Sequence, residues 1–177
     1  MPSGLAIFTL VHVAISLAAI GAGFVVAYGL LAGKRLDGWN AFFLVTTVLT
    51  SVTGFFFPVD HFMPSHAVGI VSLLVLSLAI YARYGRRLAG AWRSIYVVTA
   101  LVALYLNFFV LLVQSFQKVP ALKAVAPTQS EPPFLVTQLV VLVLFAVLIM
   151  IATIRFRRES PSIGSSASTL AQKTPRA

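Results

Sequence analysis

The sequence predicts an all-α integral membrane protein, a bundle of five transmembrane helices with its N-terminus outside and its C-terminus inside. Of its 177 residues, 59% are hydrophobic and only 10% are charged, whereas a soluble domain carries about 25% charged residues. A water-facing shell cannot be built from so few charges. The composition therefore excludes an ordinary soluble enzyme, a disordered chain and, despite the net charge of +9, a compact nucleic-acid-binding module.

Five apolar runs are long enough to cross a bilayer, which takes about 20 predominantly apolar residues per helix. Membrane β-strands would instead alternate over about 10 residues between turns, and no such pattern is present. Each run ends at a glycine, a proline or a group of basic residues. The predicted spans are about 5–31, 39–57, 64–84, 95–116 and 134–154.

The distribution of Lys and Arg predicts the orientation, because cytoplasmic loops collect these residues. With the N-terminus outside, only Lys118 and Lys123 of the 13 basic residues lie outside. The cytoplasmic side then holds the other 11, which are Lys34, Arg35, Arg83, Arg86, Arg87, Arg93, Arg155, Arg157, Arg158, Lys173 and Arg176. The predicted location is the inner (plasma) membrane of a cell, as a multi-pass protein.

The two ends of the chain are interpreted differently. Residues 1–33 lack a basic segment before their apolar run, and that run is longer than the core of a signal peptide, about 7–15 residues. We therefore expect an uncleaved first span. Residues 159–177 are rich in Ser, Thr and Ala without apolar periodicity, which predicts a disordered cytoplasmic tail. The expected organisation is a bundle over 1–158 followed by this tail.

No catalytic motif is recognisable. Cysteine is absent, which excludes thiolate chemistry, and the phosphate-loop, nucleophile-elbow and zinc-protease patterns are also missing. The favoured interpretation is a non-catalytic accessory subunit or assembly factor of a membrane complex. The partners expected are the lipid bilayer and either another membrane protein or a second copy. A small carrier or channel is a third hypothesis, suggested by the hydroxyl row Thr46, Thr50 and Thr53. Such hydroxyls more often bond back to carbonyls one turn earlier.

Polar residues within the apolar runs predict a pocket in the outer half of the bundle, because polar groups in membranes usually face the interior. His12 lies in the first span, His61 lies in the connection before the third span, and His66 lies in that span's opening turn. Three side-chain amides fall in the same depth band, and we expect them to line the pocket: Asn107, Gln114 and Gln138. We also expect His12 to face spans three and four.

Imidazoles at one depth suggest a second function, since neutral imidazole binds haem iron and divalent metals. His12 paired with His66 or His61 fits the requirement for two axial ligands on depth alone. A divalent metal held by His12, His61, His66 and Asp60 is the other cofactor hypothesis. The alternative function is therefore a membrane redox protein that binds b-type haem or a metal.

Multiple spans, His12 and the helix start His66-Ala67-Val68-Gly69 give a partial resemblance to the cytochrome b561-like membrane haem proteins. That resemblance implies haem ligation by histidines on facing helices. The chain departs from the family's four histidines in two cross-membrane pairs, because its inner half contains none. It also resembles the uncharacterised small inner-membrane proteins of bacteria, from which no activity carries over.

The cluster of arginines from Arg83 to Arg93 has two interpretations. It either fixes the topology or binds anionic lipid headgroups or the acidic face of a partner.

Overall fold

The computed structural model describes residues 4–58 and 64–158, and every regular element within them is helical. The all-α class is confirmed. The expected tail, together with His61 and Asp60, lies outside the described residues. In chain order the elements are α1 (Gly4–Leu31), α2 (Asp37–Gly54), α3 (Pro64–Ile80), the π-helical turn η1 (Tyr81–Gly85), α4 (Trp92–Lys118), the short α5 (Pro120–Val125) and α6 (Pro132–Arg158).

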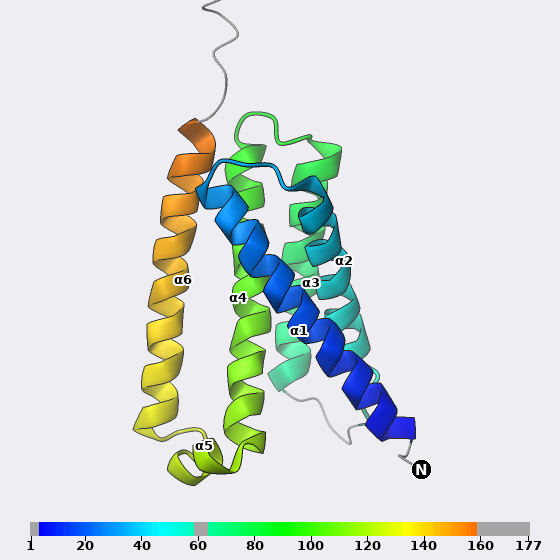
Figure 1. Ribbon diagram of the computed structural model, residues 1–177, viewed down its shortest axis with the longest axis vertical. Coiled ribbons are helices and arrows are strands. Elements are labelled where there is room, and N and C mark those ends of the chain that lie inside the picture. Colours follow the sequence, from blue (N-terminus) through cyan, green and yellow to red (C-terminus); the bar gives the residue numbers. More distant parts are fainter. Residues whose placement is uncertain (1–3, 59–63, 159–177) are drawn as a thin grey trace, which may run out of the picture.

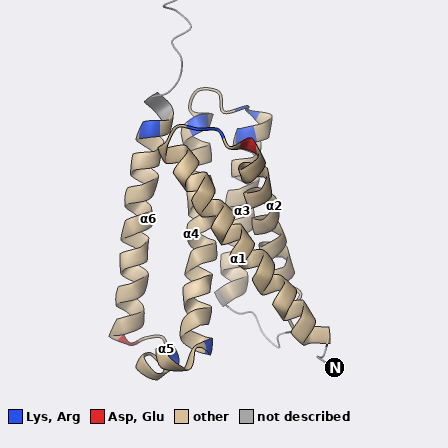
Figure 2. Cartoon of the chain, viewed as in Figure 1, with Lys and Arg blue, Asp and Glu red and all other residues tan. Residues whose placement is uncertain are grey.

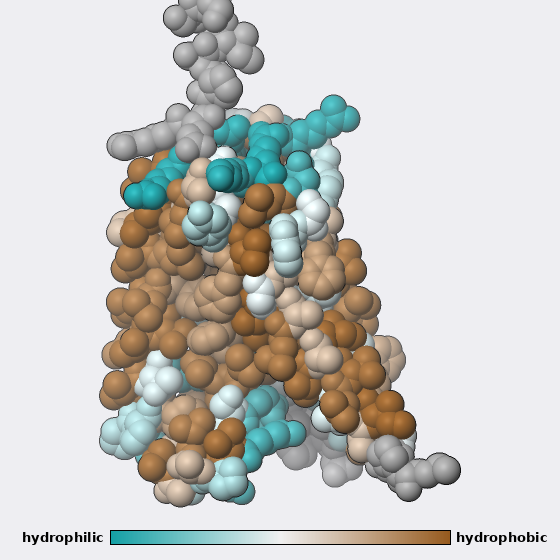
Figure 3. All heavy atoms as spheres, in the orientation of Figure 1, coloured by the Kyte–Doolittle hydropathy of each residue, from teal (hydrophilic) through white to brown (hydrophobic). Residues whose placement is uncertain are grey.

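Four segments are long and apolar enough to cross a membrane: Gly4–Leu31, Ser65–Gly85, Trp92–Lys118 and Pro132–Phe156. They correspond to four of the five predicted spans. The remaining helix, α2, has 18 residues and is not among them, because its first turn contains Asp37 and Asn40 and its second half is rich in hydroxyls. It also ends at Gly54, three residues before the end of the predicted span. An apolar band lies between two polar ends on the face drawn in Figure 3.

The helices run alternately up and down (Figure 1), with α2 packed between α1 and α3, and α4 packed against α3 and α6. Most described Lys and Arg residues gather at one end, where α1 passes into α2 and α3 passes into α4 (Figure 2). We call this the basic end. The other end, with the N-terminus of α1, Lys118, Lys123 and Glu131, is the opposite end.

The tightly packed core lies in the half of the bundle next to the basic end. Its largest fully buried side chains are Tyr96, Phe43, Leu76, Leu101, Leu104, Val26, Val97 and Thr47. They come from the second half of α1, the first two-thirds of α2, the second half of α3 and the first half of α4. Towards the opposite end the helices separate, because α1 crosses the bundle obliquely (Figure 1).

Gly23 is the point of closest approach in this crossing. A Cβ added there would lie 2.4 Å from Leu104 Cδ1 on α4 and 2.9 Å from Phe43 Cε2 on α2. Small residues let helix backbones approach in this way in membranes. The absence of a side chain at Gly23 therefore sets how closely α1 packs on both neighbours.

A capped turn joins α4 to α6 at the opposite end. The amide and hydroxyl of Thr128 donate hydrogen bonds to Glu131 Oε1 at 3.0 and 2.8 Å, and the Ser130 amide donates to Oε2 at 3.1 Å. Partial desolvation alone would raise the pKa of Glu131, but these hydrogen bonds outweigh it and lower the pKa below its usual value. A charged Glu131 thus holds the turn that starts α6.

Replacing Gly23 with Leu should destabilise the fold, since overpacking a core typically costs about 1–3 kcal/mol. Gly21 is the matched control, because a Cβ there meets nothing within 4 Å. Gly21→Leu brings the same gain in helix propensity without the clash. We expect the thermal unfolding midpoint in detergent to fall for Gly23→Leu and not for Gly21→Leu. Equal midpoints for the two variants would contradict the close crossing.

Candidate functional site

A cavity of about 500 Å³ occupies the half of the bundle towards the opposite end. Its walls come from residues 9–20 of α1, the second half of α2 with the residues that follow it, the first half of α3, and the second half of α4 with Val119. This is the region where the helices separate, so the cavity results from the oblique path of α1. Its volume lies within the usual range for small-molecule pockets, about 300–1,000 Å³.

The structure brings several of the expected pocket residues to this one cavity: His12, His66, Asn107 and Gln114 all line it. Gln138 does not, because it lies on α6, which contributes nothing to the lining. Both amide atoms of Gln138 are buried without a hydrogen-bond partner in the described part of the chain. His61 and Asp60 lie outside the described residues.

His12 contacts α2 directly, and it lines the cavity that α3 and α4 also enclose. Its Nδ1 lies 2.7 Å from Thr53 Oγ1, and its ring packs edge-on against Phe57 with 5.0 Å between centroids. His66 stacks on Phe55, at 5.6 Å between centroids and 24° between planes. Each histidine thus packs on a different residue at the C-terminal end of α2.

The hydrogen bonds of Thr53 are coupled to the tautomer of His12. The Thr53 hydroxyl lies 2.7 Å from the Leu49 carbonyl oxygen and has a single proton to donate. With that proton on Leu49 O, the hydroxyl accepts from His12, so that Nδ1 carries the imidazole hydrogen and Nε2 a lone pair; with the proton turned to Nδ1, the two ring nitrogens exchange roles. No contact to Nε2 is found among the described residues.

Most hydroxyls of α2 donate to carbonyls one turn earlier in the same helix, which is the alternative to a carrier or channel path given for the row Thr46, Thr50 and Thr53. Thr46 donates to Phe42 O, Thr47 to Phe43 O and Ser51 to Thr47 O, at 2.7, 2.7 and 3.0 Å. Thr50 is the exception on the cavity wall: its buried Oγ1 has no hydrogen-bond partner in the residues described.

Asn107 is the second unpartnered group on the cavity wall. Its side chain is 9% exposed, and its Nδ2 has no hydrogen-bond partner within the described ranges. A buried amide without a partner costs about 1–3 kcal/mol. A molecule in the cavity that accepts a hydrogen bond would remove this cost.

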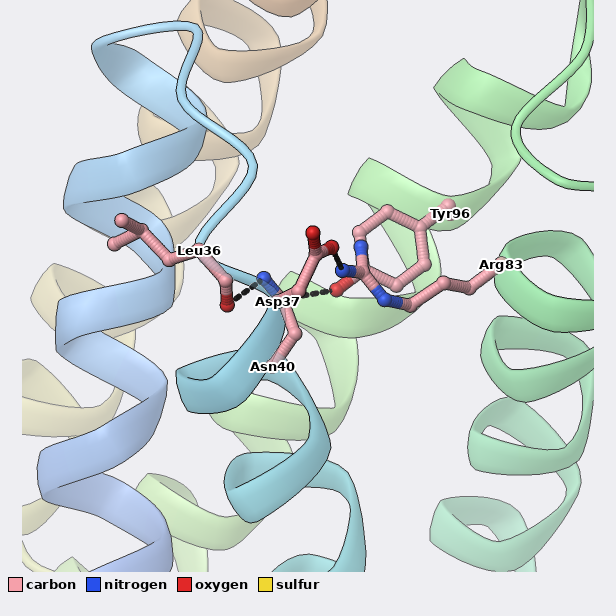
Figure 4. A network of polar contacts seen from close by, with 5 residues as sticks. All are labelled: Leu36, Asp37, Asn40, Arg83 and Tyr96. Carbon is pink, nitrogen blue, oxygen red and sulfur yellow. Dashed lines mark hydrogen bonds and ion pairs between the residues drawn. The ribbon is translucent and has the colours of Figure 1, made fainter.

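Sequence reasoning missed a second polar cluster, which lies at the basic end and joins α2, η1 and α4 (Figure 4). Arg83 pairs with Asp37, and the Tyr96 hydroxyl donates to Asn40 Oδ1. Asn40 Nδ2 in turn donates to the Leu36 carbonyl at 2.8 Å. The pattern gave no signal for this cluster, because Asp37 and Arg83 are 46 residues apart.

Arg83 therefore differs from the rest of the arginine cluster. Its side chain is 6% exposed while that of Asp37 is 78% exposed, and its guanidinium lies 5.2 Å from the ring centroid of Tyr96. A buried cation needs a partner of opposite charge. This arginine turns inward and fastens the start of α2 to α3 and α4, so it is not available for a headgroup or a partner's acidic face.

The described residues contain no group of three or more His, Asp or Glu side chains that could hold a metal ion. Of the expected metal ligands only His12 and His66 can be placed. Comparison with known proteins gives no match to a protein-family model, to a curated protein or to a solved structure.

Removing the Tyr96 hydroxyl should weaken the cluster at the basic end. Asn40 is 2% exposed, and leaving its Oδ1 without a donor costs about 1–3 kcal/mol. We expect Tyr96→Phe to lower the free energy of unfolding in detergent by that amount. Tyr28, which is 67% exposed, is the control, and Tyr28→Phe should change stability by less than about 0.5 kcal/mol. Matching losses in the two variants would contradict a structural role for the Tyr96–Asn40 bond.

Proposed function

We propose that this chain is a non-catalytic integral membrane protein that binds a small lipid-soluble molecule in the cavity and serves as an accessory subunit of a larger membrane complex. The cavity carries the proposal. It combines largely apolar walls with a few polar groups, two of them buried and unpartnered. That combination is typical of small-molecule sites.

We propose further that α2 is a fifth span and that the basic end faces the cytoplasm of a cell whose inner membrane holds the protein. Since α1 ends at the basic end and α3 starts at the opposite end (Figure 1), α2 runs along the bundle from one end to the other. At about 1.5 Å per residue, the 18 residues of α2 measure about 27 Å. Its outward face carries large exposed apolar side chains at helical spacing: Trp39, Phe42, Val45, Leu49 and Val52.

The orientation can be tested with reporter fusions. The predominance of Lys and Arg at the basic end favours a cytoplasmic position for it. A reporter fused after Ala177 should be active only in the cytoplasm, and one inserted near Thr128 only outside. A second insertion at Gly33, in the connection from α1 to α2, should report the cytoplasm if α2 crosses the membrane. The opposite pattern would overturn the topology.

Ligand binding can be tested by filling the cavity. Ser16 lines it, whereas Ala18 on the same helix is exposed and does not. We expect Ser16→Phe to lower the amount of co-purifying lipophilic molecule, extracted and quantified by mass spectrometry, about tenfold. Ala18→Phe should leave it unchanged. If both variants retain the same molecules as the wild type, the cavity is not a ligand site. Unfolding midpoints of the variants verify that both fold.

Haem binding is the second candidate, and the observation that favours it is that His12 and His66 line one cavity. The lone pair on His12 Nε2 has the form of a metal ligand, with Nδ1–H held by an outer partner as is usual for ligating histidines. The charge of the lining is less suitable for haem, because Lys118 is the only cation among the described lining residues that could pair with the two haem propionates. A Soret band in the same purified protein would favour haem, and it should disappear in His12→Ala.

Transport is supported least. The half of the bundle next to the basic end is filled by the packed core and the Arg83 cluster, so the cavity does not continue along the bundle axis.

A further inference from the structure

We propose that the cavity selects a neutral, lipid-soluble molecule with a hydroxylated aromatic head, of which a quinol is the membrane-soluble example, over the corresponding quinone. This inference rests on the proposed function and names the ligand class for the same site. The selecting group is Nε2 of His12, which accepts a hydrogen bond from the ligand hydroxyl.

The tautomer of His12 supplies the selectivity. Thr53 Oγ1 lies 2.7 Å from both Leu49 O and His12 Nδ1. In the selective tautomer the Thr53 proton is donated to Leu49 O, so that Thr53 accepts from Nδ1–H and Nε2 is left as an acceptor. A quinol hydroxyl donates to such a nitrogen. A quinone offers only carbonyl oxygens, so its head leaves Nε2 without a partner.

The arrangement of polar groups sets the direction of the ligand. Asn107 and Thr50 have unpartnered buried atoms and lie away from the opposite end of the bundle. On α4, Asn107 is further from that end than Gln114, and on α2, Thr50 is further from it than Thr53. The polar head of a ligand therefore lies beside Asn107 and Thr50, because an acyl or isoprenoid tail in that position would leave these groups unpaired. The Asn107 amide donates to a ligand oxygen in either oxidation state, so it contributes affinity without selectivity.

The charge and shape of the lining specify a neutral aromatic head. Among the described residues that line the cavity, Lys118 is the only charged one, and it is exposed at the end of α4. An anionic or cationic head would therefore be buried without a counter-charge, which is costly. Phe55, Phe57 and the His66 ring also line the cavity and offer flat surfaces for an aromatic ring.

The test measures binding of a decyl-substituted benzoquinol and of its benzoquinone to the purified full chain in detergent, by calorimetry without oxygen. We expect the quinol to bind about tenfold more tightly, which is the value of one hydrogen bond of ~1.4 kcal/mol. His12→Phe should bring the two dissociation constants within about twofold. Asn107→Leu should weaken both probes alike and keep their ratio.

Thr53→Val is the decisive variant, because it keeps the shape of the side chain and removes the acceptor for Nδ1–H. His12 is then free to carry its hydrogen on Nε2, so the preference for quinol should disappear. Thr137 is the matched control, since its hydroxyl also bonds back one turn, to Pro133 O at 2.7 Å, on exposed surface of α6. Thr137→Val should keep the wild-type ratio.

Equal affinities for quinol and quinone in the wild type, or a preference that survives Thr53→Val, would overturn the selection by His12. Binding of neither probe would overturn the ligand class. In both cases the cavity remains a ligand site if Ser16→Phe still loses the co-purifying molecule while Ala18→Phe keeps it. The failure of the ligand class is thus distinguishable from the failure of the proposed function.

Discussion

The close crossing of α1 over α2 and α4 at Gly23 is the contact on which the shape of the bundle depends. With no side chain at that position, Leu104 and Phe43 pack directly against the α1 backbone. Helices that meet this closely at an oblique angle must separate further along. The same contact therefore accounts for the packed half towards the basic end and for the cavity in the other half.

Many polar side chains in the described part of the bundle are either satisfied locally or paired with a group from another helix. Most hydroxyls of α2 bond to carbonyls of their own helix, whereas Asn40 is paired with Tyr96 from α4. The described exceptions that line the cavity are Thr50 and Asn107. Because buried polar groups are normally paired, their position on the lining of one cavity is the strongest indication that the cavity holds a molecule.

The sequence predicts well how far along the bundle axis a residue lies, and predicts poorly which neighbouring helix its side chain faces. Depth follows from counting residues along a helix, so His12, His66 and Asn107 could be assigned to one band of the bundle. Facing depends on which helices are neighbours, and one sequence does not reveal that. For this reason Gln138, at a suitable depth, lies on a helix that does not line the cavity, and the pairing of Arg83 with Asp37 gave no local signal. Most helices also extend beyond the apolar runs, because capping residues and turns outside the runs still continue the helix.

The low apolar content of α2 is explained by its position between α1 and α3. Its polar residues form hydrogen bonds and an ion pair at both ends of the bundle. Asp37 and Asn40 belong to the Arg83 cluster at the basic end, and Thr53 hydrogen-bonds to His12 towards the opposite end. Because α2 needs polar side chains for these contacts, it cannot be as apolar as α6, which contributes no residue to the cavity lining. The feature that separates α2 from the four helices that are long and apolar enough to cross a membrane is therefore a consequence of its structural role. It is compatible with crossing the membrane, because its outward face remains apolar along its length.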